Sequence, residues 1–266
     1  MAWKSVKAVL LDLNGTLHVG DAPTQGAVLA LKRLRMSGIP VRFVTNTTKE
    51  SRRALKKRLD SIGFGIELNE IYTALRAAHS LIRQRHLRPY YIMEDDALLE
   101  EFSDLPRSGE ADGSDASAVV VALAPSKFDY ATMNRAFRIL QAGNPLIAIH
   151  KARLYKRPDG LALGPGPFVE ALEYASGVRA EVVGKPEIAF FRACMDGLNC
   201  SPDEVVMIGD DVRDDVRGAM DAGLRAVLVR TGKYRSGDDS LLENTGGVAC
   251  DTFASAVDML LGDDIS

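Results

Sequence analysis

The sequence lacks any long apolar run, and none approaches the roughly 20 residues that a transmembrane helix needs. Its first residues reach charged side chains at Lys4, Lys7 and Asp12 without the apolar stretch of a secretory signal. With 36 acidic and 33 basic residues, the formal net charge is −3. That balance gives no strong electrostatic case for a nucleic acid or a membrane surface, so we expect neither as a partner.

Cysteine is scarce, and the spacing of the few cysteine residues suggests no metal site. Cys194, Cys200 and Cys250 have no metal-ligand spacing, and an odd, small number fits a reducing compartment. The four histidines show no ligand spacing, and there is no internal repeat or low-complexity segment. These absences predict a cytoplasmic globular protein. We expect a monomer or a small oligomer, with a homodimer left open.

The first apolar run, residues 6–11, ends at a carboxylate. Asp12 follows it directly, and Gly15 and Thr16 come soon after. The pattern is typical of a buried parallel strand that places Asp12 at its carboxyl end, where open α/β sheets bind ligands. An aspartate there can attack phosphorus and form an aspartyl-phosphate if a metal ion screens the charge repulsion. The other interpretation is that Asp12 only caps the next helix.

Three later apolar runs also end in polar clusters. Residues 39–44 precede Thr45-Asn46-Thr47-Thr48, residues 181–183 precede Gly184-Lys185-Pro186, and residues 205–208 precede Gly209-Asp210-Asp211. If these runs are strands of one doubly wound sheet, all four strand ends lie on one edge. Separated carboxylates and backbone oxygens suit Mg²⁺, whereas a lysine, hydroxyls and N–H groups suit phosphate oxygens.

Thr45 and Lys185 are candidates for contacting a phosphoryl group. We expect the Thr45 hydroxyl to donate to it, together with the N–H groups of Asn46 and Thr47 at the start of the next helix. Thr45 could also be an N-cap, and Lys185 could be a solvated strand-end residue. We favour phosphate binding for Lys185, since phosphoryl oxygens and Asp12 bring together more negative charge than one Mg²⁺ offsets.

Strands alternate with segments of helical periodicity, which predicts an α/β protein with a doubly wound parallel sheet. The length allows two units, one inserted in the other. We expect core parts at residues 1–77 and 181–266 around an inserted α/β domain at residues 78–180. Core helices are expected at residues 26–36, 49–61, 187–197 and 214–222. In the inserted domain, strands are expected at residues 90–93, 118–122 and 146–149, and helices at residues 128–143 and 168–176.

The polar strand ends, in this order, resemble the four motifs of the haloacid dehalogenase (HAD) superfamily of phosphohydrolases, over the whole chain. The matching segments are Asp12-Leu13-Asn14-Gly15-Thr16, Thr45-Asn46, Lys185 and residues 209–215. The resemblance implies that the inserted domain is a type C2 cap, which would exclude water from the reacting phosphate. It also implies that Asp12 is the nucleophile, and that Mg²⁺ is bound by Asp12, Asp210 and the main-chain carbonyl of Asn14.

Four acidic residues near the last strand end have open roles. Asp210 could instead be an N-cap for the following helix. For Asp211 and Asp215 we expect one to hydrogen-bond a metal-bound water and the other to orient Lys185. Asp214 fits a solvated helix face nearly as well, and we leave it out of the site.

Asn14 departs from the family pattern. Most HAD phosphatases carry a second aspartate there, which protonates the leaving group and then activates water. A carboxamide has no titratable proton near neutral pH, and loss of a general acid–base typically costs about 10²–10⁴-fold. The sequence therefore predicts a Mg²⁺-dependent phosphohydrolase that acts on a small phosphorylated substrate or a phospho-side chain and favours good leaving groups.

Two other classes of protein stay open. One is a catalytically weak binding or scaffold protein that keeps the fold and the metal site. The other is a phospho-acceptor receiver domain, against which the inserted domain and the Gly209-Asp210-Asp211 strand end argue. Dehalogenation is disfavoured, because that chemistry has no use for an acidic metal cluster.

Overall fold

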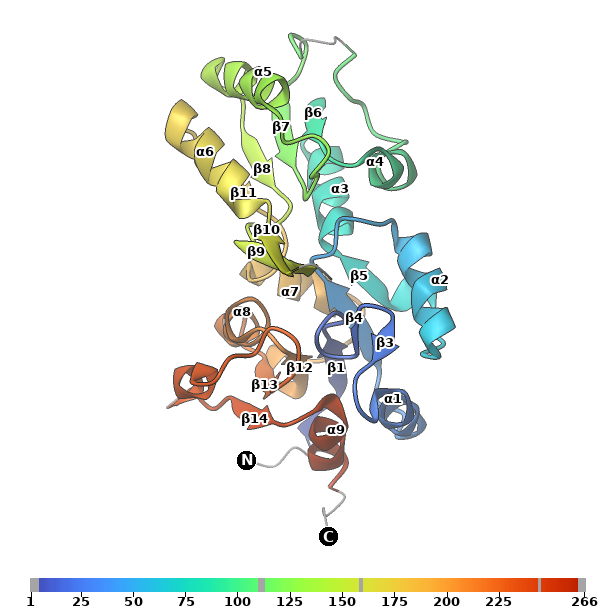
Figure 1. The fold of residues 1–266 in the computed structure, drawn as a ribbon. Helices are drawn as coiled ribbons and strands as arrows, with labels where there is room; N and C mark the ends of the chain where they lie inside the picture. Colours follow the sequence, from blue (N-terminus) through green and yellow to red (C-terminus); the bar gives the residue numbers. More distant parts are fainter. Residues whose placement is uncertain (1–4, 110–112, 158–159, 244, 263–266) are drawn as a thin grey trace. The chain divides into compact units, whose positions relative to one another are not determined.

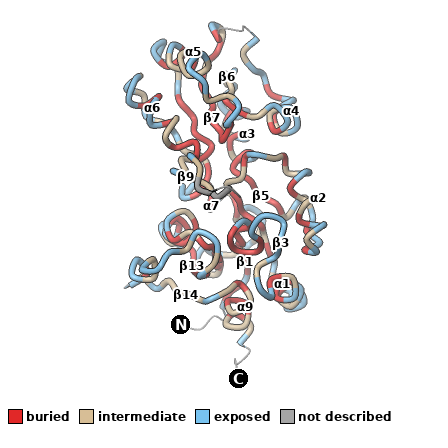
Figure 2. Tube along the Cα trace, viewed as in Figure 1, coloured by how far each residue is buried: buried red, intermediate tan, exposed pale blue. Residues whose placement is uncertain are grey.

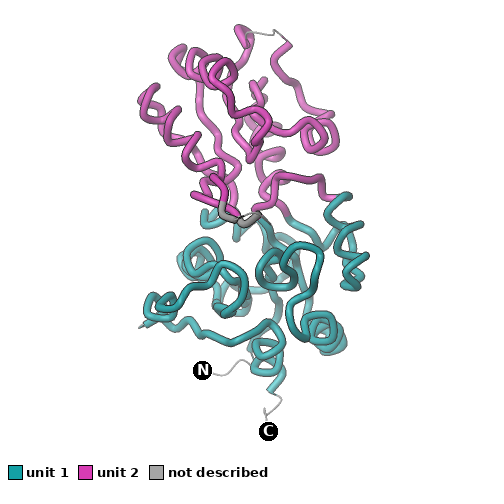
Figure 3. Tube along the Cα trace, viewed as in Figure 1, with its two compact units in different colours: residues 1–45, 53–72, 185–266 teal, residues 46–52, 73–184 magenta. Residues whose placement is uncertain are grey.

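The computed structural model describes residues 5–109, 113–157, 160–243 and 245–262. Its chain divides into two compact units, shown in two colours in Figure 3. Unit 1 comprises residues 1–45, 53–72 and 185–266, and unit 2 comprises residues 46–52 and 73–184. The units therefore meet between residues 72 and 73 and between residues 184 and 185. The domain boundaries expected from the sequence lie a few residues away, at 77/78 and 180/181.

Unit 1 is built on a six-stranded sheet in the order β14-β13-β12-β1-β4-β5. Each pairing with a described register is parallel: β1 with β12, β1 with β4, β12 with β13, and β13 with β14. The strands are β1 (Ala8–Leu11), β4 (Val41–Thr45), β5 (Ile71–Thr73), β12 (Val205–Gly209), β13 (Arg225–Val229) and β14 (Val248–Cys250). A small hairpin pairs β2 (His18–Val19) with β3 (Ala22–Pro23).

The winding of this sheet reverses next to β1. From β1 the chain moves outward to β4 and β5, then returns to β12 on the other side of β1 and continues to β13 and β14. The carboxyl ends of β1 and β12 therefore flank the topological switch point, the position where open α/β sheets bind ligands. All four residues of β1 and all five of β12 are buried, which explains why both segments are continuous apolar runs.

Helices of unit 1 bury their apolar stripes in this core. Helix α1 packs against α9, and α7 packs against α8. Figure 2 shows the buried residues concentrated along the central strands and the inner helix faces. The helical segments are α1 (Ala27–Met36), α2 (Arg52–Ile62), η2 (Leu68–Glu70), α7 (Ile188–Met195), η3 (Pro202–Glu204), η4 (Val212–Arg217), α8 (Gly218–Asp221), η5 (Asp238–Leu242) and α9 (Phe253–Leu261).

Unit 2 has its own parallel sheet, in the order β11-β8-β7-β6 (Figure 1). Helices α5 and α6 pack together, and α5 also contacts β7. The strands are β6 (Pro89–Ile92), β7 (Ala118–Val121), β8 (Leu146–Ala148), the antiparallel pair β9 (Leu154–Arg157) and β10 (Gly160–Leu163), and β11 (Ala180–Val182). The helices are α3 (Ala74–Gln84), α4 (Asp95–Glu101), α5 (Tyr130–Gln141) and α6 (Gly166–Ser176).

The fold class is confirmed: a doubly wound parallel α/β core holds an inserted α/β cap with a separate sheet. One expectation about the sheet is wrong. The run at residues 181–183 does not supply a strand of the core, because β11 pairs with β8 of unit 2, in register Glu181 to Ile147. Only three of the four polar strand ends thus belong to the core sheet, and Lys185 enters the core from a loop.

Candidate active site

Asp12 lies directly after β1, and the sheet itself fixes its position. Its N–H donates to the carbonyl of Ile208 in β12 at 2.9 Å, which extends the β1–β12 pairing by one residue. The Asp12 side chain is largely buried. Burial of a carboxylate is unfavourable unless a cation or hydrogen-bond donors compensate its charge. The groups around Asp12 must therefore supply such compensation.

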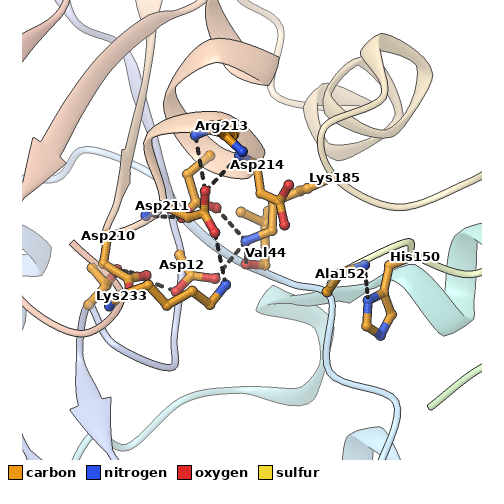
Figure 4. A network of polar contacts seen from close by, with 12 residues as sticks. Asp12, Val44, His150, Ala152, Lys185, Asp210, Asp211, Arg213, Asp214 and Lys233 are labelled. Atoms are coloured by element: carbon orange, nitrogen blue, oxygen red, sulfur yellow. Dashed lines mark hydrogen bonds and ion pairs between the residues drawn. The ribbon is translucent and has the colours of Figure 1, made fainter. Parts of the chain in front are cut away.

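Lys185 supplies that compensation (Figure 4). Its ammonium lies 2.6 Å from Asp12 Oδ1 and 2.6 Å from Asp215 Oδ1, and it donates to the carbonyl of Val44 at 3.2 Å. Burial by itself would lower the pKa of Lys185, but the attraction of Asp12 and Asp215 outweighs it and the pKa lies above its ordinary range. Lys185 is therefore a fixed, buried positive charge.

Asp210 completes a group of three buried carboxylates. Asp12, Asp210 and Asp215 each offer one oxygen, and these three atoms lie within 4.8 Å of one another. Burial, reinforced by the charges of Asp12 and Asp215, holds the pKa of Asp210 well above its ordinary value. Three buried carboxylates thus lie together, and the Lys185 ammonium pairs with two of them, Asp12 and Asp215.

Asp211, rather than Asp210, caps the following helical segment. Asp211 Oδ1 accepts hydrogen bonds from the N–H groups of Arg213 at 3.0 Å and Asp214 at 3.1 Å. The segment η4 opens with a π-helical turn, in which Val216 donates to the carbonyl of Asp211 at 3.2 Å. Asp215 lies in this π-helical segment, and its Oδ1 accepts a hydrogen bond from Lys185. Such turns occur often at functional sites.

The sequence-predicted residues of motif two are placed differently from the expectation. Thr45 is the buried last residue of β4, but helix α2 begins only at Arg52. Asn46 and Thr47 therefore do not sit at a helix start, and Thr45 is no N-cap. Both Asn46 and Thr47 belong to unit 2, where a side chain at Gly184 would collide with Asn46 Oδ1.

Asn14 is exposed, in the turn between Asp12 and the β2–β3 hairpin. Gly15, the next residue, has a φ of 101°, and its N–H donates to the carbonyl of His18 at 2.7 Å. This left-handed conformation favours glycine. The turn brings Gly15 against Asp210, since a Cβ on Gly15 would collide with that carboxylate.

Sequence reasoning missed three residues of the site: Thr16 and Lys233 contact the carboxylates, and Thr231 contacts the turn after Asp12. Thr16 Oγ1 donates to Asp12 Oδ2 at 3.3 Å and lies 3.5 Å from Asp210 Oδ1. The Lys233 N–H donates to Asp210 Oδ2 at 2.6 Å, and the Thr231 hydroxyl donates to the carbonyl of Gly15 at 2.5 Å. Thr231 and Lys233 follow strand β13, and their position after a strand of the core sheet is the sequence signal that could have identified them.

Comparison with known proteins finds hydrolase family models and close relatives along the chain. A haloacid dehalogenase-like hydrolase family model matches residues 9–105, and a HAD-hydrolase-like model matches residues 182–256. Haloacid dehalogenase-like hydrolase domain-containing protein 2 of Bos taurus is 53% identical over 97% of each chain. Phospholysine phosphohistidine inorganic pyrophosphate phosphatase of Xenopus laevis is 41% identical over 98% of this chain and 97% of its own.

A solved structure has the same fold over most of this chain. The glycerol phosphate phosphatase of Mycobacterium tuberculosis, in complex with magnesium, superposes with a TM-score of 0.84 at 25% identity. The match covers 95% of this chain and 77% of that one. Among the helices that the structure describes here, none is long and apolar enough to cross a membrane.

The chain belongs to the haloacid dehalogenase-like hydrolase family. Within that family it is an enzyme of the HAD-type phosphatase class.

Proposed function

We propose that the protein is a Mg²⁺-dependent phosphohydrolase that uses Asp12 as its nucleophile and acts on small phosphorylated molecules or phospho-side chains. One observation carries the proposal: three buried carboxylates lie together beside the switch point of the sheet, and a buried ammonium pairs with two of them, Asp12 and Asp215. The arrangement combines a nucleophile, an oxygen-rich cation site and a fixed positive charge within a few ångströms.

The carboxylate group fits a divalent cation. Three buried carboxylates, those of Asp12, Asp210 and Asp215, lie together, and the Lys185 ammonium pairs with two of them. Hard carboxylate oxygens at a strand end are the ligands that Mg²⁺ prefers. We propose Asp12, Asp210 and the carbonyl of Asn14 as the protein ligands. When bound, the cation offsets the charge repulsion between Asp12 and a phosphoryl group.

The two chemical steps follow from the side chains present. A carboxylate oxygen of Asp12 attacks phosphorus, the bond to the leaving group breaks, and the leaving group departs with the electron pair. Water then attacks the phosphorus of the aspartyl-phosphate, which releases inorganic phosphate and restores Asp12. Lys185 orients Asp12 by its hydrogen bond to Oδ1, and it is the candidate for offsetting charge on the phosphoryl oxygens. Asp215 holds Lys185 in place.

Asn14 sets the preferred leaving group. An exposed carboxamide there cannot donate a proton to a departing alkoxide, so esters of simple alcohols should react slowly. Aryl oxides, acyl oxygens, phosphate and the protonated nitrogen of a phosphoramidate depart without that help. The name of the Xenopus relative includes phospholysine, phosphohistidine and pyrophosphate, which are substrates of this kind. We propose the same substrate classes for this protein.

The test is hydrolysis of p-nitrophenyl phosphate with and without Mg²⁺. We expect activity that requires Mg²⁺ and collapses in Asp12→Asn and Asp210→Asn. Wild-type turnover that persists in EDTA would contradict the metal-dependent mechanism. Mg²⁺ binding without turnover of any good-leaving-group substrate would instead favour the second candidate, a catalytically weak binding protein, which the replacement of the usual acid by Asn14 also suggests.

A further inference from the structure

The segment after β13, Thr231-Gly232-Lys233, contacts the site from outside the four family motifs. It makes two short hydrogen bonds to different parts of the site. The Thr231 hydroxyl donates to the carbonyl of Gly15 at 2.5 Å, and the Lys233 N–H donates to Asp210 Oδ2 at 2.6 Å. We call it the 231–233 segment. It links the turn after Asp12 to a carboxylate almost two hundred residues away in the sequence.

The middle residue of the segment must be glycine for this approach. Gly232 has a φ of 57°, and a Cβ there would collide with Asp210 Oδ2 and with Gly15 Cα. A Cβ on Gly15 would collide with the same carboxylate. Two glycines from separate parts of the chain therefore close over Asp210, whose exposed fraction is 0%. The close approach of backbone to a functional group is a recognised use of glycine.

These contacts fix which oxygen of Asp210 faces the rest of the site. Oδ2 accepts the Lys233 N–H, whereas Oδ1 lies 3.5 Å from Thr16 Oγ1. The same Thr16 hydroxyl donates to Asp12 Oδ2 at 3.3 Å, so Oδ1 is the oxygen turned toward Asp12. Rotation of the carboxylate would break the Lys233 hydrogen bond. Figure 4 shows Asp210 next to Asp12 and Lys233.

We propose that the 231–233 segment is a positioning element for the metal site. It holds the Asp210 carboxylate in one orientation, with Oδ1 facing the cation, and it holds the Gly15 turn next to that carboxylate. The inference rests on the proposed Mg²⁺ site. Groups that hydrogen-bond a ligating carboxylate orient it, and their loss typically lowers metal affinity about 10–100-fold.

The experiment measures Mg²⁺ dissociation constants by calorimetric titration of the full chain, with urea unfolding in EDTA as a separate readout. The variants are Gly232→Ala, which pushes the segment away, and Thr231→Val, which removes the hydroxyl at constant shape. Gly65→Ala is the matched control, because Gly65 has the same φ of 57° and a Cβ there would meet nothing within 4 Å. Thr231→Ser restores the hydroxyl and tests for rescue.

We expect Gly232→Ala and Thr231→Val to raise the Mg²⁺ dissociation constant about 10–100-fold, with Gly65→Ala and Thr231→Ser at the wild-type value. If Gly232→Ala does not fold, the Thr231→Val and Thr231→Ser pair decides. Wild-type affinity in the folded variants, even with reduced stability, would overturn the inference and leave the proposed function intact. Absence of Mg²⁺ binding by the wild-type protein would overturn both.

Discussion

With Asn14 in place of the usual aspartate, the site has a candidate nucleophile, Asp12, but no acid at position 14 to transfer a proton. Asp12 has the surroundings of a nucleophile, because it is buried and held by Lys185 at 2.6 Å. Two positions later, where most HAD phosphatases have an aspartate, the exposed side chain is an amide. The proposed attack on phosphorus therefore has its nucleophile. A poor leaving group, however, finds no proton donor at position 14.

Restoring the acid tests that idea. Asn14→Asp should raise the hydrolysis rate of alkyl phosphates by about 10²–10⁴-fold and that of aryl phosphates or phosphoramidates much less. The physical reason is that only alkoxides need a proton from the enzyme to depart. The measurement is the slope of log rate against leaving-group pKa, which should flatten in the variant.

An equal gain across all leaving groups, or none, would show that Asn14 is not the missing acid. Asn14-Gly15 is a dipeptide prone to deamidation, and the product would resemble the variant. Peptide mass spectrometry of the wild-type preparation is therefore the control, and the comparison should use protein with intact Asn14.

Replacing Lys185 tests its role as the buried cation shared by Asp12 and Asp215. Lys185→Met keeps most of the side-chain volume but leaves Asp12 and Asp215 without their shared cation. We expect the free energy of unfolding in EDTA to fall by about 3–5 kcal/mol, since a buried charge loses its partner. Competition by inorganic phosphate should also weaken in whatever fraction stays folded.

Lys233→Met is the matched control, because it removes the same charge from a side chain that is 45% exposed beside Asp211. We expect it to cost about 0–1 kcal/mol, as for surface ion pairs. Equal losses in the two variants, measured by urea unfolding, would contradict a special role for Lys185.

At the scale of elements, helix α6 and strand β11 of unit 2 are joined by one buried carboxylate. Glu173 on α6 accepts the N–H of Ala180, the first residue of β11, at 2.7 Å and the ammonium of Lys151 at 2.8 Å. Burial raises the pKa of Glu173, but the Lys151 ammonium and the Ala180 N–H outweigh it. The pKa therefore lies below its ordinary value of 4.5.

A carboxyl whose folded pKa is lowered stabilises the fold above its unfolded pKa, and that contribution is lost as the pH falls through the folded value. Glu173→Gln should therefore lower the free energy of unfolding at pH 7 by about 1.5–3 kcal/mol, the contribution of hydrogen bonds to a charged group. The difference from wild type should shrink as the pH is lowered from 4.5 through the folded value.

Urea unfolding of both proteins across this pH range provides the measurement. Glu170→Gln is the control, since Glu170 contacts the same Lys151 but its side chain is 61% exposed. A surface pair of that kind contributes about 0–1 kcal/mol. A Glu173→Gln defect that stays constant with pH would contradict the assigned cause.

At the scale of the whole molecule, the carboxylates and the lysine of the site all belong to unit 1. Mg²⁺ should therefore stabilise unit 1 directly, because a ligand that binds only the folded state raises its stability by mass action. Hydrogen exchange followed by mass spectrometry resolves this along the chain. We expect added Mg²⁺ to increase protection of β1 and β12 but not of β7 and β8.

Asp12→Asn should abolish the Mg²⁺-dependent protection at β1 and β12. Protection that rises equally in both units, or that persists in Asp12→Asn, would contradict binding at the carboxylate group.

The sequence by itself determined the fold class and the class of chemistry. Continuous apolar runs such as Val205–Gly209 are typical of strands buried on both faces, as in a parallel sheet covered by helices. A carboxylate directly after such a run must lie at the sheet edge, so the strand-end positions of Asp12 and Asp210 follow from local pattern. The order of the motifs then indicated the family.

Tertiary structure decided which of these residues meet. A short strand such as Ala180–Val182 can pair in either sheet, and only the packing of the whole chain assigns it to β8. Lys185 lies 173 positions from Asp12 in the sequence, and Asp215, which also contacts it, lies in the π-helical segment η4. Local sequence reports the conformation of neighbouring residues, whereas contacts between distant segments depend on how the finished elements pack. The 231–233 segment belongs to the second kind, since its contacts with Gly15 and Asp210 exist only in the folded sheet.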